Sequence, residues 1–226
     1  LGRTADARDG FELAAQSVEL RAAAWTELAR LGLRGGDFER AAADAERSLD
    51  FNFRNLEGHQ LLALARRLGG RADEAAASVD ALLALDPLST CGRFEKALAS
   101  GGDAPRAFAA SLKGERPEEV LLELAAWYHG IGRGMEAERV LEVAPKNVEV
   151  LYWLAFLKER RGEPGAAEAL QAADAASLAL VFPFRAESAE VLAWASSKSA
   201  SWKPRYALAL VHWGAGNAEE TRRLLE

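Results

Sequence analysis

The sequence predicts an all-α fold in which antiparallel helix pairs stack side by side as a right-handed superhelix. The first observation is a period of 34 residues, which two sets of small residues follow: Gly2, Gly36 and Gly70, and Ala7, Ala41 and Ala75. The second is composition, since half of the residues are hydrophobic and 27% are charged, as in close-packed helices with solvated outer faces. The third is that no segment requires a strand. Because one such pair cannot bury its apolar face alone, neighbouring pairs must stack.

Each expected helix pair is held together by small residues, and the turn within each pair is marked by a glycine. Alanines such as Ala29 and Ala63 let two helices approach closely, while Trp25 and Leu28 fill the space between successive pairs. A glycine ends a helix at low cost because it readily adopts the left-handed conformation. The glycines at these turns are Gly36, Gly70, Gly132, Gly162 and Gly216.

These signals predict the helices in order along the chain. In the N-terminal half we expect helices at 3–15, 20–34, 38–51, 56–68, 72–84, 90–99 and 104–112. Pro117 and Pro204 begin helices, because a proline in the first helical turn loses no hydrogen bond. In the C-terminal half we expect helices at 118–130, 134–142, 148–161, 165–174, 186–197 and 203–225, the last one broken at Gly214 to Gly216.

The repeats assign the whole chain, residues 1–226, to one helical repeat domain, which we expect to be a fragment of a longer protein. At the start, Ala14 already occupies a second-helix position of a repeat whose first helix is absent. Residues 176–201 depart from the repeat, and Pro183 disfavours helix at Phe182. The expected division is a half repeat 2–21, repeats 22–55 and 56–89, a degenerate repeat 90–117, repeats 118–147 and 148–175, an insertion 176–201 and a partial repeat 202–226.

Charge and hydropathy exclude two classes of partner. The net charge of −6 argues against nucleic acid, whose phosphates require an extended basic surface. No apolar run approaches the roughly 20 residues of a membrane-spanning helix, so we expect no membrane insertion. Cys91 is the single cysteine, which rules out an internal disulfide and is compatible with the cytoplasm, where we place the protein.

No motif for catalysis, metal binding or cofactor binding stands out. The glycine-rich run 130–134 follows a helix instead of a strand, so we interpret it as a hairpin turn. The acid pairs Glu118-Glu119 and Glu219-Glu220 lie in first helical turns, where the helix dipole explains them better than a glycosidase mechanism does. The three histidines lack metal-ligand spacing: His59, His129 and His212. We therefore predict a protein that is not an enzyme and has no catalytic residue, metal site or cofactor.

The surface expected to bind a partner is the inner wall of the superhelix, formed by the first helix of each repeat. Projection onto a period of 3.6 residues places these candidates on it: Arg30, Arg34, Gln60, Arg67, His129, Tyr152, Phe156, Arg160, Lys203, Tyr206 and Trp213. The basic residues have another explanation, because the helix macrodipole favours cations late in any solvated helix. The aromatic residues are the better candidates, since apolar rings facing a groove need something to cover them.

The expected contact surface is therefore aromatic: Tyr152, Phe156, Tyr206 and Trp213. One alternative stays open, in which the segment 178–198 folds across the groove through Phe182 and Phe184 and covers these rings. Other aromatic residues fall at or beside core positions and are expected to serve packing: Trp25, Trp127, Tyr128 and Trp153.

The order of these residues resembles the tetratricopeptide repeat. One copy reads Trp25, Leu28-Ala29, Gly36 and Ala41, and the next reads Leu62-Ala63, Gly70, Ala75 and Asp86-Pro87, with His59 in place of the usual tryptophan. The resemblance implies a helix-turn-helix solenoid that serves as an interaction scaffold.

Three runs carry a narrower resemblance: Leu85-Asp86-Pro87-Leu88, Val181-Phe182-Pro183-Phe184-Arg185 and Ser201-Trp202-Lys203-Pro204. They are similar to the repeat region of large bacterial proteins that also carry a sugar-mutarotase-like, β-rich part, a region of unknown function. That resemblance implies a carbohydrate-related β-sandwich in the same polypeptide.

Three interpretations of function follow. The first is a non-catalytic scaffold that binds a partner peptide or protein domain, possibly a domain of the same polypeptide, along its concave groove. The second is an accessory domain of a carbohydrate-active protein, in which groove aromatics contact a linked β-sandwich or a sugar. The third is a structural spacer or oligomerisation arm.

Overall fold

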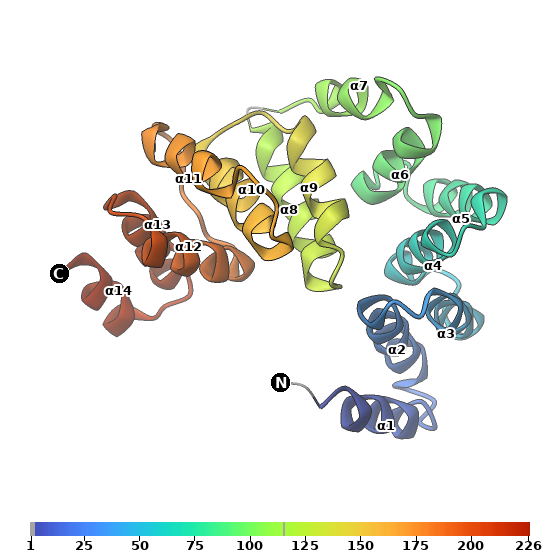
Figure 1. The fold of residues 1–226 in the computed structure, drawn as a ribbon. Coiled ribbons are helices and arrows are strands. Elements are labelled where there is room, and N and C mark those ends of the chain that lie inside the picture. Colours follow the sequence, from blue (N-terminus) through green and yellow to red (C-terminus); the bar gives the residue numbers. More distant parts are fainter. Residues whose placement is uncertain (1–2, 115) are drawn as a thin grey trace. The chain divides into compact units, whose positions relative to one another are not determined.

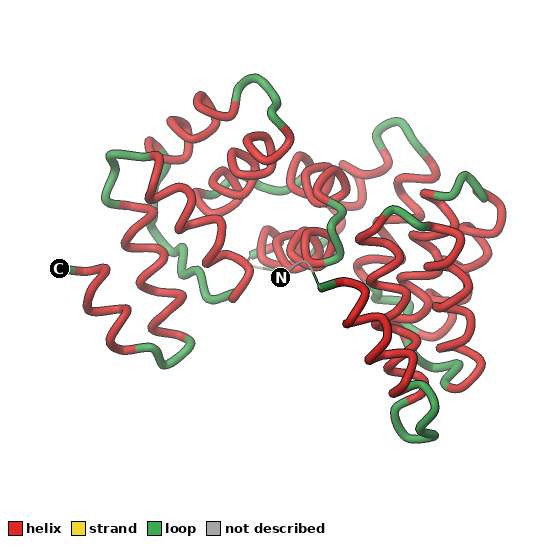
Figure 2. The backbone as a smooth tube through the Cα atoms, turned by 60° about the horizontal axis from the view of Figure 1, so that its bottom comes forward, coloured by secondary structure: helices red, strands yellow, loops and turns green. Residues whose placement is uncertain are grey.

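The computed structural model describes residues 3–114 and 116–226, and its described part consists of helices joined by turns and loops (Figures 1 and 2). No strand occurs among these residues, so the all-α helical solenoid expected from the sequence is confirmed. The helices are α1 (Thr4–Ala14), α2 (Arg21–Gly35), α3 (Phe38–Phe51), α4 (Leu56–Leu68), α5 (Ala72–Leu85), α6 (Thr90–Ser100), α7 (Ala104–Ser111), α8 (Pro117–Gly130), α9 (Gly134–Val143), α10 (Val148–Arg161), α11 (Ala166–Ala175), α12 (Ala186–Lys198), α13 (Lys203–Gly214) and α14 (Ala218–Leu225).

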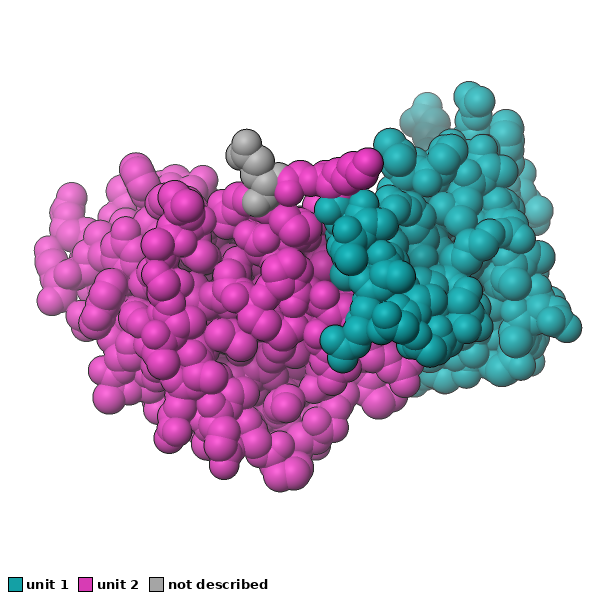
Figure 3. Space-filling view, turned by 90° about the horizontal axis from the view of Figure 1, so that it is seen from above, with its two compact units in different colours: residues 1–112, 131–133 teal, residues 113–130, 134–226 magenta. Residues whose placement is uncertain are grey.

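The described chain forms two compact units, drawn in different colours in Figure 3. Unit 1 comprises residues 1–112 and 131–133, and unit 2 comprises residues 113–130 and 134–226. Within each unit, successive helices pack on one another as antiparallel pairs, for example α2 with α3 and α10 with α11. Each unit therefore has a hydrophobic core of its own.

Unit 1 repeats the same helix pair with a shift of 34 residues. α5 begins and ends 34 residues after α3, and α6 begins 34 residues after α4. The core contains Leu28 and Leu61, which have no solvent exposure. Gly36 ends α2 in the left-handed conformation, with φ of 80°, and the Asp37 side chain then accepts a hydrogen bond from the backbone N–H of Arg40 at the start of α3.

Unit 2 has a more aromatic core. Tyr128 and Trp153 are completely buried, which confirms the packing role expected for these two rings. Asn147 caps α10 by accepting a hydrogen bond from the N–H of Val150 at 2.9 Å, and Gly162 ends the helix with φ of 65°.

The segment between α11 and α12 is not helical, as the proline in it predicts. Its side chains alternate, with Val181, Pro183 and Arg185 buried and Phe182 and Phe184 exposed. This alternation is typical of an extended chain with one face on a core. Arg185, the residue immediately before α12, is therefore buried within unit 2.

Candidate partner-binding site

The turn glycines and the Leu-Ala pairs align the last helix pair, α13 and α14, with the earlier ones. Ala209 lies seven residues before Gly216, as Ala29 lies seven before Gly36 and Ala155 seven before Gly162. In this alignment Tyr206 is equivalent to Tyr152 of α10. Each first helix therefore presents comparable positions to whatever packs on it.

The face of α13 that carries Tyr206 borders an open apolar pocket. The pocket has a volume of about 310 Å³ and lies between α13 and α14, lined by Tyr206, Ala209, Leu210, Trp213, Thr221 and Leu225. Ala209 is buried, whereas Trp213 is 70% exposed and Leu225 is 55% exposed. Trp202 extends this face, since its ring meets that of Tyr206 edge to face with centroids 5.7 Å apart. Large apolar side chains thus surround a hollow with the buried Ala209 at its floor.

In α10 the residues equivalent to Tyr206 and Leu210 are Tyr152 and Phe156, and both are buried. Tyr152 is 0% exposed and Phe156 is 2% exposed. α12 packs on α10, and its Trp194 lies against Phe156 with ring centroids 5.7 Å apart. A neighbouring helix therefore covers Phe156, the equivalent of Leu210, whereas Trp213 aligns with Glu159, which is exposed in α10 as Trp213 is in α13.

The expectation that Tyr152 and Phe156 present their rings to a partner is wrong. Tyr152 donates a hydrogen bond to Asp174 Oδ1 at 2.8 Å, and burial, together with this hydrogen bond, raises the pKa of its phenol. Phe156 contacts Trp153 as well as Trp194. For Tyr152 the physical reason is its hydrogen bond to α11, and for Phe156 it is that the segment 178–198 packs over it.

The segment covers Phe156 through a residue that the sequence did not single out. Phe182 and Phe184 remain exposed, and it is Trp194 of α12 that lies against Phe156. Trp194 lies within α12, and nothing in the sequence of a helix indicates which distant ring one of its tryptophans will contact.

The predicted basic residues of unit 1 have partners within the unit. Arg30 pairs with Glu57 of α4 and with Glu27 of its own helix. Arg67 forms two hydrogen bonds with the buried carboxylate of Glu95, at 2.6 and 3.1 Å. The remaining two predicted residues lie on α2 and α4 respectively, Arg34 exposed and Gln60 half-buried.

The predicted polar residues of unit 2 are also engaged. His129 and Arg160 both approach the carboxylate of Glu190, each at 3.4 Å. Lys203 Nζ donates to the backbone carbonyls of Asp174 and Ala176, each at 2.6 Å, and so closes the C-terminal end of α11. Of the eleven residues predicted from the sequence, the structure brings Tyr206 and Trp213 together in one open apolar pocket.

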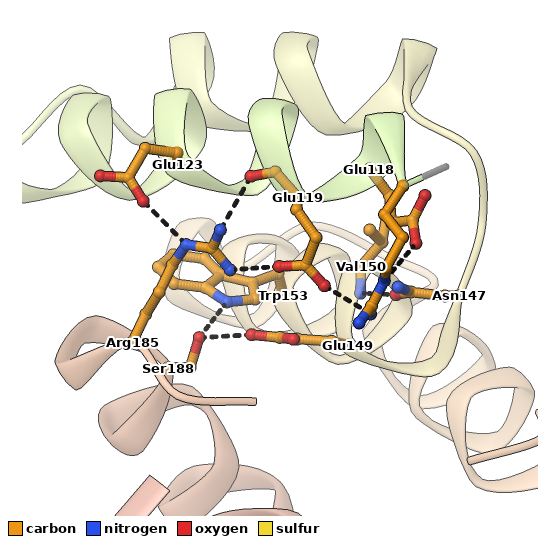
Figure 4. A network of polar contacts seen from close by, with 10 residues as sticks. Glu118, Glu119, Glu123, Asn147, Glu149, Val150, Trp153, Arg185 and Ser188 are labelled. Carbon is orange, nitrogen blue, oxygen red and sulfur yellow. Dashed lines mark hydrogen bonds and ion pairs between the residues drawn. The ribbon is translucent and has the colours of Figure 1, made fainter. Parts of the chain in front are cut away.

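A polar network ties α12 to α8 in unit 2 (Figure 4). The guanidinium of Arg185 donates to Glu119 Oε2 at 2.7 Å, to the Glu119 carbonyl at 2.9 Å and to Glu123 Oε2 at 2.9 Å. Burial by itself would lower the pKa of Arg185, but the hydrogen bonds to Glu119 and Glu123 outweigh it and raise this pKa. Glu119 also accepts from Arg116, so its carboxylate is held by two guanidinium groups.

Beside this network lies a buried glutamate of α10 (Figure 4). Glu149 is 1% exposed, and its Oε1 accepts a hydrogen bond from Ser188 Oγ at 2.7 Å. Ser188 in turn accepts from the indole N–H of Trp153 at 3.1 Å. Desolvation by burial raises the pKa of Glu149, although the hydrogen bond from Ser188 opposes this. The carboxylates of Glu119 and Glu149 thus hold helices in place. The sequence suggested only a helix-dipole role for Glu119 and did not indicate these contacts.

No group of three or more His, Cys, Asp or Glu side chains in residues 3–114 and 116–226 is arranged to hold a metal ion. Within the same residues, no helix combines the length and apolarity that crossing a bilayer requires. Cys91 is buried.

Comparison with known proteins adds little to this geometry. No family model and no curated protein sequence matches the chain. Among solved structures, that of Naa15/Naa10 bound to HypK-THB is 17% identical and matches 99% of this chain with a TM-score of 0.35. The chain covers 39% of the matched chain of that structure. Similarity at this level carries no functional argument. The helices themselves define the class, an all-α helical-repeat protein built from antiparallel helix pairs.

Proposed function

We propose that this chain is a non-catalytic protein-interaction scaffold that binds a partner through the pocket between α13 and α14. The observation that carries the proposal is the exposure of Trp213, Tyr206 and Leu225 around the buried Ala209. Aromatic side chains at a packed, desolvated centre commonly dominate the energy of protein interfaces. An exposed apolar pocket of this kind marks a binding site more often than a plain surface.

The kind of partner follows from what packs at equivalent positions elsewhere in the chain. α4 packs on the α2–α3 pair and buries Leu61, Leu62 and Ala65. α12 packs on α10 in unit 2 and buries Val191 and Leu192. Each of these helices is amphipathic, with an apolar face on its neighbour. We therefore take the partner to be an amphipathic helix of another protein or of another domain, bound in the groove.

The test begins with a photo-crosslinking amino acid at position 213 and, as the matched control, at Phe53, an equally exposed aromatic residue of unit 1. A helical peptide recovered at position 213 and absent at position 53 is then measured against the wild-type protein. Trp213→Ala should weaken its binding by about 2 kcal/mol, because truncating an aromatic anchor removes most of its contact area. Phe53→Ala should leave the dissociation constant unchanged.

The same measurement can refute the proposal. If Trp213→Ala binds the recovered peptide as tightly as the wild type, the pocket is not the contact surface. Circular dichroism of both variants shows whether the helices are intact, so a loss of binding through unfolding is recognised directly.

A second candidate function rests on the flat rings along α13. Trp202, just before the helix, and Tyr206 and Trp213 on it are all exposed, and exposed rings of this kind also stack on sugars. In this alternative the chain is the accessory domain of a carbohydrate-active protein with a mutarotase-like β-sandwich, in line with the narrower sequence resemblance. A glycan array separates the two, because binding to a glycan that is lost in Trp202→Ala and Trp213→Ala supports the carbohydrate function alone.

A further inference from the structure

Unit 1 contains a second pocket, remote in sequence from α13 and α14. It lies between α4, α5 and α6, has a volume of about 390 Å³, and is lined by Arg67, Ala72, Ala75, Ala76, Val79, Asp80, Glu95, Lys96, Ala99 and Ser100. Ala75, Val79 and Glu95 form a buried floor, whereas the surrounding alanines and Ser100 are exposed. The pocket is therefore an open slot with walls of small side chains.

The 34-residue register explains why the slot exists here. Ala72 stands where the preceding repeat has Phe38, and Ser100 stands where it has Arg66. Phe38 is half-buried and lies close to Gly69, the residue that follows α4. A Cβ atom added to Gly69 would be 3.7 Å from the Cβ atom of Phe38. Arg66 bridges helices by pairing with Glu46 of α3 at 2.6 Å. Ala72 and Ser100 thus leave the slot without the phenyl ring and the guanidinium that the preceding repeat has at these positions.

The floor of the slot also differs from the preceding repeat. Arg67 and Glu95 stand where that repeat has Leu33 and Leu61, both completely buried. The two charges satisfy each other through two hydrogen bonds, and at the rim Lys96 Nζ pairs with Asp80 Oδ1 at 2.9 Å. Two cations are therefore balanced by two anions around the slot. A charged ligand would disturb this balance and lose hydration without gaining a net opposite charge.

We propose that this slot is a binding site for a small, uncharged aromatic molecule whose ring takes the place of the phenylalanine ring missing from it. The volume lies within the range of small-molecule pockets, and the lining is mostly apolar with a few polar groups, as in such pockets. The ring lies between the alanines of α5 and α6, over Val79. The site is separate from the partner-binding pocket, and the failure of one proposal leaves the other untouched.

Indole is a suitable probe because it is aromatic and uncharged. Methyl-labelled protein is titrated with indole and followed by NMR, and we expect shifts of the Ala75, Val79 and Ala99 methyl signals that saturate. Ala72→Phe restores the residue of the preceding repeat and should weaken binding by at least about tenfold, because its ring occupies the slot. The matched control is Ala77→Phe, which adds the same ring at an exposed position of α5 that does not line the pocket.

Ser100→Arg is a second filling variant and should also weaken indole binding. Benzoate and benzylammonium test the charge argument, and each should bind at least about tenfold more weakly than indole. The proposal is overturned if indole leaves the three methyl signals unmoved, if Ala72→Phe and Ala77→Phe bind it equally, or if either charged probe binds more tightly than indole.

Discussion

Burial divides the aromatic side chains of unit 2 into two kinds with different roles. Phe156 has Trp153, Trp194 and the imidazole of His129 around it, with ring centroids between 5.6 and 6.5 Å away. Trp213 stands mostly in solvent. A buried ring contributes to folding through the surface that it removes from water, whereas an exposed ring becomes useful when a partner covers it.

Replacement of Phe156 by Ala is therefore expected to destabilise the fold. The loss should be about 3 to 5 kcal/mol, as for other buried rings, because the surrounding side chains fill the cavity only in part. Urea unfolding followed by circular dichroism measures it. Trp213→Ala, the exposed counterpart, should change the free energy of unfolding by less than about 0.5 kcal/mol. Equal midpoints for the two variants would show that Phe156 is not a core residue.

Glu149 should make the stability of unit 2 depend on pH. Its pKa in the folded state is raised above the ordinary value of 4.5 by desolvation, so the folded protein holds the proton more tightly than the unfolded chain. Between these two pKa values the folded state binds more protons, and the free energy of unfolding falls as pH rises through that interval. At higher pH the Glu149 carboxylate is charged in the folded state, and its burial lowers the free energy of unfolding by a constant amount.

Glu149→Gln removes that charge and keeps an oxygen for the Ser188 hydroxyl. It should stabilise the protein by about 1 kcal/mol near pH 8 and have almost no effect near pH 4. Thermal unfolding at both pH values measures the difference, with Glu142→Gln as the exposed control from the same unit. A stabilisation that is the same at both pH values would contradict the assignment to the titration of Glu149.

Polar contacts hold the N-terminal end of α12 to two other helices of unit 2. Arg185, the residue before the helix, reaches Glu119 and Glu123 of α8, and Ser188 in its first turn reaches Glu149 of α10. Apolar contacts add to this, through Val191 and Leu192 on the buried face. The helix is therefore anchored at its N-terminal end, the end that follows the extended segment.

Loss of that anchor should be felt along the whole helix. Arg185→Ala leaves Glu119 with one guanidinium partner in a largely buried position and should reduce the free energy of unfolding by about 3 kcal/mol. Hydrogen exchange of the α12 amides should accelerate more than that of α10. Arg160→Ala is the matched control, because its guanidinium is exposed and pairs with Glu190 at 3.4 Å, so about 0.5 kcal/mol or less is expected. Exchange rates that are alike in the two variants would argue against the anchor.

On the scale of the molecule, two units with separate cores share one repeating plan. Unit 1 buries leucine and alanine at equivalent positions of successive pairs, whereas unit 2 buries Tyr128, Tyr152 and Trp153. Helical repeats gain stability from contacts with their immediate neighbours. Changes in one core are thus expected to act mainly within the unit that contains them. The two proposed binding sites follow the same division, one in each unit.

The sequence alone determined the helices and their order. Gly36 and Gly70 lie at the turns that the 34-residue period predicts, Gly162 and Gly216 lie at turns expected from their glycines, all four with positive φ, and Pro117 lies at the first residue of α8. Most helix bounds agree to within one or two residues because caps, turns and the apolar period are local, and a local signal is complete within a short stretch of chain.

The tertiary structure decided which faces are covered. Tyr152 and Tyr206 have the same place in their repeats, yet one is buried beneath the chain that follows it and the other is exposed. Nothing in the period distinguishes them, since burial depends on whether a distant helix packs there. The pairing of Arg185 with Glu119, 66 residues apart, arises in the same way. Local patterns therefore specify each helix and the face it offers, whereas only the packing of the helices settles whether that face becomes core or remains open to a ligand.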